Sequence, residues 1–214
     1  MNKNNLWFNV AIVSFAIFFI ALVLVAVDMP RIDSLVSDYI LNLGQDSVKQ
    51  FFILFNFHLD KILLGLAVFV ISILFFRERK KESLILFFSL IVGYAWGSLT
   101  KIFVHRPRPI LSFVQETGYS FPSNHATFSV ILFSLIIYFF ARRVENILVR
   151  KIFIFINVLF ILLTCFSRIY LNVHWFTDVV GGFALGVFIV SVVILFLKSL
   201  NTCARQGHMS TTNF

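Results

Sequence analysis

The sequence predicts an all-α integral membrane protein, a six-helix transmembrane bundle with a short amphipathic surface helix on its outer face. Three observations lead to this fold class. Of the 214 residues, 59% are apolar, 29 are Phe and only 13% are charged, which lies outside the range of soluble domains. Apolar runs of membrane-spanning length recur along the chain. The basic residues gather between particular runs, as they do in multi-pass proteins.

The first apolar run, residues 7–27, contains no charged residue and is too long for the core of a signal peptide. No small-residue cleavage site follows it, so we expect an uncleaved first span. Six helices fill the chain, and residues 1–214 are therefore expected to form one domain. Residues 199–214 are polar and are expected to form a flexible tail. The expected spans are residues 7–27, 51–76, 83–104, 122–141, 147–166 and 175–197.

Between the first two spans, residues 30–50 show apolar side chains at helical spacing with Asp33, Ser37 and Asp38 between them. Gly44 is a suitable helix stop. This pattern predicts an amphipathic helix that lies on the outer surface with its apolar side down. Such a helix could cap the bundle or gate a substrate, and the sequence does not choose between the two.

The net charge of +8 follows the topology of the spans. The positive-inside rule makes the loops that hold the basic clusters cytoplasmic, and both termini with them. This distribution indicates membrane orientation and argues against a nucleic-acid partner. The two clusters are Arg77, Arg79, Lys80 and Lys81 after the second span, and Arg142, Arg143, Arg150 and Lys151 after the fourth.

Three polar segments interrupt the apolar pattern, and the alternation of spans places all three on the outer surface. They are residues 101–109 (KIFVHRPRP), 122–125 (PSNH) and 167–178 (SRIYLNVHWFTD). Polar and charged residues at the ends of membrane spans are costly unless they serve a function. Their convergence therefore predicts a functional site at the outer face of the membrane.

The third segment holds His174 and Asp178, which lie four residues apart and hence on one face of a helix. The carboxylate can fix the imidazole tautomer and leave the other ring nitrogen free as a nucleophile. Arg168 can hold phosphate oxygens with a bidentate guanidinium. Taken alone, the His–Asp pair would be interpreted as a structural hydrogen bond.

The second segment opens a helix, because Pro122 suits a first helical turn. The backbone amides of Ser123 and Asn124 would then face outward at the positive end of the helix dipole, where oxyanions bind. The Ser123 hydroxyl adds a donor, and His125 could protonate a leaving alkoxide. As an isolated fragment, this segment could be no more than a helix cap.

The first segment supplies Lys101, Arg106 and Arg108, and each arginine precedes a proline that stiffens the loop. Three cations on the outer side run against the charge rule, and an anionic partner would account for them. The alternative is that these side chains reach to lipid headgroups, which explains one such residue better than three.

Within the spans, five residues depart from the apolar pattern. Asp60 and Lys61, with His58, interrupt the second span and need partners. They could form an internal ion pair or could support the functional site. Gly182 and Gly186 have the four-residue spacing that lets two helices approach closely, so we interpret them as packing positions.

Together the three segments resemble the signature of the type 2 phosphatidic acid phosphatase superfamily. That signature is Lys-x6-Arg-Pro, then Pro-Ser-Gly-His, then Ser-Arg-x5-His-x3-Asp. The first motif matches Lys101 with Arg108 and Pro109, and both spacings of the third match. Arg106 falls outside the pattern and is an auxiliary candidate. Asn124 replaces the family glycine, a mild change if the position needs a left-handed backbone.

The resemblance implies a metal-independent phosphatase without a cofactor, working through a phosphohistidine. His174 would attack phosphorus with the help of Asp178, and His125 would protonate the departing oxygen. The remaining motif residues would hold the phosphoryl oxygens, with charge stabilisation and positioning carrying most of the catalysis. These phosphate-binding residues are Lys101, Arg108, Ser123, Asn124 and Arg168.

The expected function is therefore hydrolysis of a lipid phosphate at the periplasmic face of a bacterial inner membrane. Relatives of this kind act on undecaprenyl pyrophosphate, phosphatidylglycerol phosphate, phosphatidic acid or lipid A phosphates, and we favour the first two. Two alternatives stay open. The same pocket could transfer the phosphoryl group to another acceptor, or it could bind or transport a lipid phosphate without catalysis. The sequence does not indicate an oligomeric state.

Overall fold

The computed structural model describes residues 3–27, 31–43 and 46–210, with side chains described from residue 5 to residue 200 of these ranges. Within them the chain forms helices, turns and loops and no strand. Membrane-length apolar runs account for most of the helices, since a helix satisfies its own backbone polar groups in lipid. The helices are α1 (Lys3–Val27), α2 (Arg31–Asn42), α3 (Asp46–Phe76), α4 (Lys80–Val104), α5 (Asn124–Phe140), the short 3₁₀ helix η1 (Ala141–Arg143), α6 (Ile147–Tyr170) and α7 (Phe176–Ser210).

Six helices, α1 and α3 to α7, are long and apolar enough to cross a membrane, which confirms the predicted fold class. The starts of these helices and the ends of the first five lie close to the expected boundaries. The sixth continues further, because α7 runs to Ser210, beyond the expected end at residue 197. Residues 199–210 of the expected flexible tail are therefore helical, and residues 211–214 lie outside the described residues.

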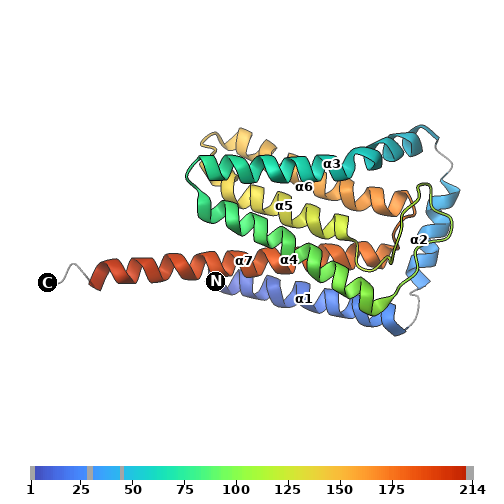
Figure 1. The fold of residues 1–214 in the computed structure, drawn as a ribbon, viewed down its shortest axis with the longest axis horizontal. Coiled ribbons are helices and arrows are strands. Elements are labelled where there is room, and N and C mark those ends of the chain that lie inside the picture. The colour runs from blue at the N-terminus through green and yellow to red at the C-terminus, as the bar shows by residue number, and fades with distance from the viewer. Residues whose placement is uncertain (1–2, 28–30, 44–45, 211–214) are drawn as a thin grey trace.

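The helix α5 lies at the centre of the bundle and packs against α4, α6 and α7, while α1 runs along α7 (Figure 1). Two small residues allow α7 to approach α5. A Cβ atom at Gly182 would lie 2.4 Å from the carbonyl oxygen of Ser123, and one at Gly186 would lie 2.7 Å from Cβ of Val130. These contacts confirm that both glycines are packing positions.

The amphipathic helix α2 lies across one end of the bundle, as Figure 1 shows, but its orientation differs from the expected one. Asp33 is buried together with Ile40, whereas Leu35 and Tyr39 remain exposed. The expectation that the apolar side faces down therefore holds for Ile40 and not for Leu35 or Tyr39. The reason is a buried arginine, described below, that gives the Asp33 carboxylate a partner inside the protein. The proposed stop at Gly44 lies outside the described residues.

At the same end of the bundle, the backbone sets the directions of the first-segment cations. Helix α4 ends where His105 adopts a left-handed conformation (φ 52°) and donates its N–H to the Lys101 carbonyl at 3.0 Å. The following Arg106–Pro107–Arg108 stretch is not helical. The guanidiniums of Arg106 and Arg108 reach different partners along this loop: Arg106 contacts two carboxylates, whereas Arg108 lies beside His174.

Candidate active site

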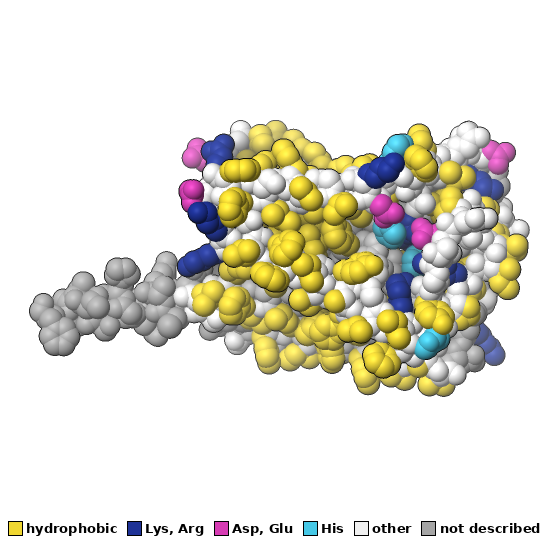
Figure 2. Space-filling view, in the orientation of Figure 1, with side chains coloured by type: hydrophobic (Ala, Val, Ile, Leu, Met, Phe, Trp, Pro, Cys, Tyr) yellow, Lys and Arg dark blue, Asp and Glu magenta, His cyan; other side chains and the backbone are white. Residues whose placement is uncertain are grey.

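The three polar segments meet at the end of the bundle that α2 covers. They come from the end of α4 and its following loop, the start of α5, and the junction of α6 with α7. Figure 2 shows histidine, acidic and basic side chains gathered there in a hollow beside the α4–α5 loop, away from the apolar sides of the bundle. The site residues that the sequence predicted are thus brought to one region.

Within this region, His174 and Asp178 are both buried, at the loop before α7 and in its first turn. Asp178 Oδ2 lies 3.4 Å from His174 Nδ1 and also accepts the Trp175 backbone N–H at 2.9 Å. On the other side of the ring, Arg108 Nη1 lies 3.2 Å from Nε2. A guanidinium can only donate, so Nε2 accepts and the ring proton resides on Nδ1, toward Asp178. The lone pair of Nε2 therefore faces the cations.

The surroundings of His174 favour its neutral form. Burial lowers its pKa, and the positive charges of Arg168, Arg108 and Lys101 lower it further, to well below the ordinary 6.5. An imidazole that is neutral at physiological pH keeps its lone pair, which is what a nucleophile requires.

Arg168 is the most enclosed of the cations, with no exposed surface. Its Nη1 donates to Asn56 Oδ1 on α3, and its Nη2 donates to Glu116 Oε1 at 2.5 Å. The third nitrogen, Nε, has no hydrogen-bond partner among the described residues. A buried guanidinium with a spare donor is suited to a further anionic oxygen.

The other two cations, Arg108 and Lys101, are anchored by carbonyl groups of the α4–α5 loop. Arg108 Nε donates to the Gly118 carbonyl at 3.1 Å. Lys101 Nζ donates to the carbonyls of Tyr119 and Ser120 at 2.6 and 3.1 Å. These bonds use some of the donors and fix the charged groups in place, so the cation cluster is preorganised before any anion binds.

Glu116, in the same loop, lies between two of these cations. Its Oε2 is 3.9 Å from Arg108 Nη2, in addition to the contact of Oε1 with Arg168. Burial acts to raise the pKa of this carboxyl, but Arg168, His125 and Arg108 together hold it below its usual value. Glu116 is therefore ionised at neutral pH, and it demonstrates that the cation cluster accommodates an oxyanion.

His125, in the first turn of α5, pairs with a residue of α3. Its Nε2 lies 2.5 Å from Asp60 Oδ1. The described ion pairs join Asp60 to His125 rather than to Lys61, whose Nζ lies 5.2 Å from the centre of the Phe57 ring. Of the two interpretations of Asp60, support for the functional site fits this geometry, and the internal Asp60–Lys61 pair does not.

Asn124 is the first residue of α5, and Ser123 precedes it. The expectation that the Ser123 backbone N–H faces outward for an oxyanion is wrong, because it donates to the Asp178 carbonyl at 3.0 Å. Ser123 Oγ accepts the Ala126 backbone N–H at 3.4 Å, which makes this residue the N-cap. Asn124 is not among the described residues with positive φ. Its side chain is accommodated by Gly97 on α4, where a Cβ atom would lie 2.2 Å from Asn124 Oδ1. The replacement of the family glycine thus needs no left-handed backbone.

Arg106, the auxiliary candidate, contacts the predicted catalytic residue Asp178. Only 5% exposed, it bridges two buried carboxylates: Nη1 contacts Asp178 Oδ1 and Nη2 contacts Asp33 Oδ2, each at 2.5 Å. Asp33 also accepts the N–H and hydroxyl of Thr177, at 2.8 and 2.6 Å, at the start of α7. Helix α2 is thereby tied to the carboxylate that faces His174.

Three residues near the predicted site were assigned no role from the sequence, and a fourth, Asp60, had two interpretations. Asp33, Asn56 and Glu116 partner the buried arginines, and Asp60 partners His125. The feature of the sequence that could have identified them is the need to balance the charge of the buried arginines. Buried cations require nearby acceptors, and Asp33 and Glu116 are acidic residues on the outer side of the chain.

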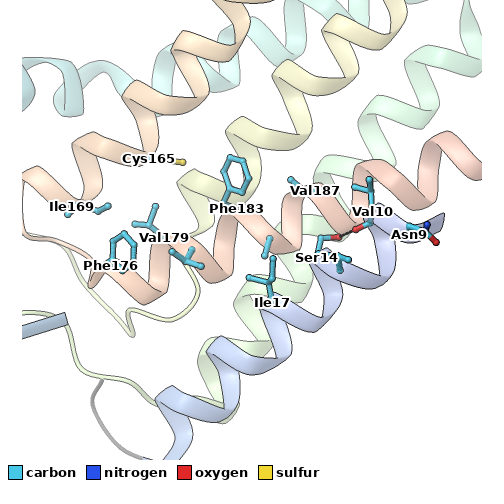
Figure 3. A pocket seen from close by; sticks show the side chains of 13 residues that line it. Asn9, Val10, Ser14, Ile17, Cys165, Ile169, Phe176, Val179, Phe183 and Val187 are labelled. Atoms are coloured by element: carbon cyan, nitrogen blue, oxygen red, sulfur yellow. Dashed lines mark hydrogen bonds between the residues drawn. The ribbon is translucent and has the colours of Figure 1, made fainter. Parts of the chain in front are cut away.

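A cavity of about 570 Å³ between α1, α6 and α7 lies elsewhere and lacks this chemistry (Figure 3). No Lys, Arg, Asp or Glu is among its described lining residues. The hydroxyl of Ser14, which lines it, is satisfied by the Val10 carbonyl at 2.7 Å. This cavity suits hydrocarbon and offers nothing to a phosphoryl group.

Comparison with known proteins agrees with the geometry. A family model described as the PAP2 superfamily matches residues 82–201, which include all three motifs. Over 137 residues, the chain is 30% identical to phosphatidylglycerophosphatase B of Bacillus subtilis (strain 168), covering 63% of this chain and 67% of that protein. Over 121 residues, it is 32% identical to dolichyldiphosphatase of Saccharomyces cerevisiae (strain ATCC 204508 / S288c), covering 52% of this chain and 50% of the yeast protein.

The fold is also similar to a solved structure. The crystal structure of the first transmembrane PAP2 type phosphatidylglycerolphosphate phosphatase from Bacillus subtilis superposes with a TM-score of 0.76. The match covers 87% of this chain and 96% of that chain at 24% sequence identity. This likeness establishes the arrangement of the helices.

Proposed function

The chain belongs to the PAP2 superfamily, and from this premise we propose that it is a membrane lipid phosphatase that works through a phosphohistidine on His174. The observation that carries the proposal is the two-sided environment of that imidazole. Nδ1 faces the Asp178 carboxylate, and Nε2 faces the Arg108 guanidinium. A lone pair that is directed at a cluster of cations is where a phosphoryl group, held by those cations, would be attacked.

In the first step, His174 Nε2 forms a bond to phosphorus while the bond from phosphorus to the lipid oxygen breaks. Arg168, Arg108 and Lys101 hold the phosphoryl oxygens, with the Ser123 hydroxyl and the Asn124 amide at the start of α5. The phosphoryl group takes over the Arg168 donor that Glu116 uses in the described structure. The Asp178 carboxylate stabilises the positive charge that develops on the imidazole.

His125 gives a proton to the departing lipid oxygen, and Asp60 holds its ring in place through Nε2. In the second step, a water molecule gives a proton to His125 and attacks phosphorus, the bond between phosphorus and Nε2 breaks, and inorganic phosphate leaves. Both imidazoles then regain their starting protonation states. The three cations supply the charge neutralisation that a metal ion supplies in other phosphatases, so we propose that no metal is required.

The proposed substrate is a phosphate monoester or pyrophosphate on a lipid. The embedded position of the site and the names of the two curated relatives support this class, since one acts on phosphatidylglycerophosphate and the other on a dolichyl diphosphate. The identities of 30% and 32% do not separate a glycerolipid from a polyprenyl substrate. We propose phosphatidylglycerol phosphate and undecaprenyl pyrophosphate as the first two substrates to test.

The decisive experiment compares wild-type protein with His174→Ala on a panel of lipid phosphates in the presence of a chelator. We expect at least one lipid to release phosphate, with the release abolished in the variant and unaffected by the chelator. Phosphate that appears only when an acceptor lipid is present would instead indicate a phosphotransferase. A wild-type protein that binds these lipids and cleaves none would refute the proposal and leave a binding protein.

A further inference from the structure

A second cavity, of about 600 Å³ and lined by both charged and apolar residues, lies at the end of the bundle opposite the candidate active site. The start of α4, the end of α5 with η1, and α7 near Leu200 form its walls. Four of its lining residues are cations that come from two separate segments of the chain: Arg79, Lys81, Arg142 and Arg143. This size is within the range of roughly 300–1,000 Å³ that is typical of small-molecule sites.

Within the part of the chain that the structure describes, the positive charges that line this cavity exceed the negative ones. Its acidic residue, Glu82, is already paired with Arg79, whose Nε and Nη2 donate to Glu82 Oε1 at 3.2 and 3.0 Å. Among the described residues, neither Lys81 nor Arg143 forms an ion pair. Arg142 lies over the Tyr138 ring, with its guanidinium carbon 5.8 Å from the ring centre. Three positive charges therefore face one cavity without a counter-charge.

The rest of the wall is apolar and continues onto the surface that faces lipid. Leu84, Phe196 and Leu200 line the cavity and are each about half exposed (52%, 54% and 47%). A small soluble anion would satisfy the cations and leave this apolar wall unused. A ligand that carries both a negative headgroup and hydrocarbon chains satisfies both parts.

We propose that this cavity binds the headgroup of an anionic phospholipid from the leaflet opposite the candidate active site. Basic pockets between transmembrane helices at the cytoplasmic side are suited to such headgroups. The positive-inside pattern alone requires only that cations lie in the loops at this end. It does not require that cations from the α3–α4 and α5–α6 connections converge on one concave, partly apolar surface.

The test measures lipid binding by native mass spectrometry of detergent-purified protein. The probes are cardiolipin, which is anionic and carries no terminal phosphate monoester, phosphatidylcholine as the uncharged comparison, and inorganic phosphate as the soluble anion. The test variant is Arg142→Gln/Arg143→Gln. The matched control is Arg77→Gln/Lys151→Gln, which removes two exposed cations from the same end of the bundle that do not line the cavity.

We expect wild type to bind cardiolipin in preference to phosphatidylcholine, with little binding of inorganic phosphate. The test variant should bind cardiolipin roughly 10- to 30-fold more weakly, because each cation near a headgroup contributes about a factor of five. The control should retain wild-type affinity. Equal weakening in both variants would show general charge attraction and refute the site, as would no weakening in either. Stronger binding of inorganic phosphate than of cardiolipin would refute a lipid ligand.

Two further measurements keep this result separate from folding and from catalysis. The charge-conserving variant Arg142→Lys/Arg143→Lys should bind cardiolipin within a few-fold of wild type, and a melting curve of each variant checks that the fold is intact. His174→Ala should not change cardiolipin binding, because His174 is at the other end of the bundle. These measurements can therefore refute the lipid site without affecting the proposed phosphatase activity. They can equally refute the phosphatase activity without affecting the lipid site.

Discussion

At the scale of single residues, the site depends on how buried polar groups share a few partners. The two carboxylate oxygens of Asp178 have different partners. Oδ1 accepts a hydrogen bond from Arg106, while Oδ2 accepts the Trp175 N–H and faces His174. The carboxylate therefore cannot rotate without losing a buried hydrogen bond. A fixed carboxylate fixes the tautomer of His174, and through it the direction of the reactive lone pair.

The lowered pKa of His174 predicts the pH dependence of the reaction. Because its pKa lies well below 6.5, His174 stays neutral as the pH falls through 6.5, and it is lost as a nucleophile only at more acidic pH. We expect kcat/KM to stay nearly constant from pH 7.5 to pH 6.5 as far as this group is concerned, since kcat/KM reports the free enzyme. A pH–rate profile in detergent checks this. An acidic limb centred at or above pH 6.5 that His174 can be shown to cause would contradict it.

Asp33 is predicted to act on turnover through Arg106, as a positioning residue. Asp33→Asn removes one of the two carboxylates of Arg106, and loss of one buried partner costs on the order of 3 kcal/mol of stability. We expect kcat to fall roughly 10- to 100-fold, because Asp178 is less well held, with KM nearly unchanged. Asp38→Asn, on the exposed side of the same helix, is the matched control and should behave as wild type. A large rise in KM with unchanged kcat would assign Asp33 to substrate binding.

At the scale of elements, close helix approaches bring the start of α5 into place. Helix α7 approaches α5 at Gly182 and Gly186, and α4 approaches it at Gly97. The approach at Gly97 leaves the space that the Asn124 side chain occupies, so the departure from the family motif on α5 is matched by a small residue on α4. The N-terminus of α5, where the phosphoryl group is proposed to bind, is therefore set by the packing of three helices.

This packing predicts the effect of adding one methyl group. Gly97→Ala would place Cβ 2.2 Å from Asn124 Oδ1, and overpacking of this kind costs about 1–3 kcal/mol. We expect a lower melting temperature and a loss of activity as the start of α5 shifts. Gly65→Ala is the matched control, because a Cβ atom there has no neighbour within 4 Å.

The double variant Gly97→Ala/Asn124→Gly separates this clash from other effects, since it removes the side chain that the new methyl group would strike. Its melting temperature should return toward that of wild type. If the melting temperature of the double variant falls by the sum of the falls seen in the two single variants, Gly97 and Asn124 are not coupled.

At the scale of the whole molecule, the bundle separates two kinds of charge. The predicted catalytic residues and their acidic partners lie at the end that α2 covers, and the unbalanced basic residues lie at the other end. If the basic end is cytoplasmic, as the positive-inside rule predicts, the active site opens to the periplasm. This orientation follows from the sequence and is a proposal that labelling can test.

The orientation predicts which engineered cysteines react on intact cells. Ile110→Cys lies in the α4–α5 loop beside the site, where the native side chain is 96% exposed, and Glu78→Cys lies in the exposed turn between α3 and α4. In a Cys165→Ser/Cys203→Ser background, a membrane-impermeant maleimide should label position 110 on intact cells and position 78 only after lysis. The opposite pattern would place the active site in the cytoplasm.

The sequence by itself determined the number, order and approximate bounds of the spans, because a membrane helix needs only a sufficiently long apolar run. It also determined that three polar segments share one side of the membrane, because alternating spans leave no other arrangement. Their spacing was enough to indicate the superfamily, which the family comparison then confirmed.

Only the tertiary structure decided which groups partner one another. Arg106 and Arg108 are two residues apart, yet one is bound by carboxylates of α2 and α7 and the other faces His174. Likewise, Asp60 is adjacent to Lys61 in the sequence and pairs with His125 of another helix. The length of an apolar run sets which segments enter the membrane. The choice among nearby polar partners depends on distances of a few ångströms between separate helices, which follow from how the side chains of all the helices pack.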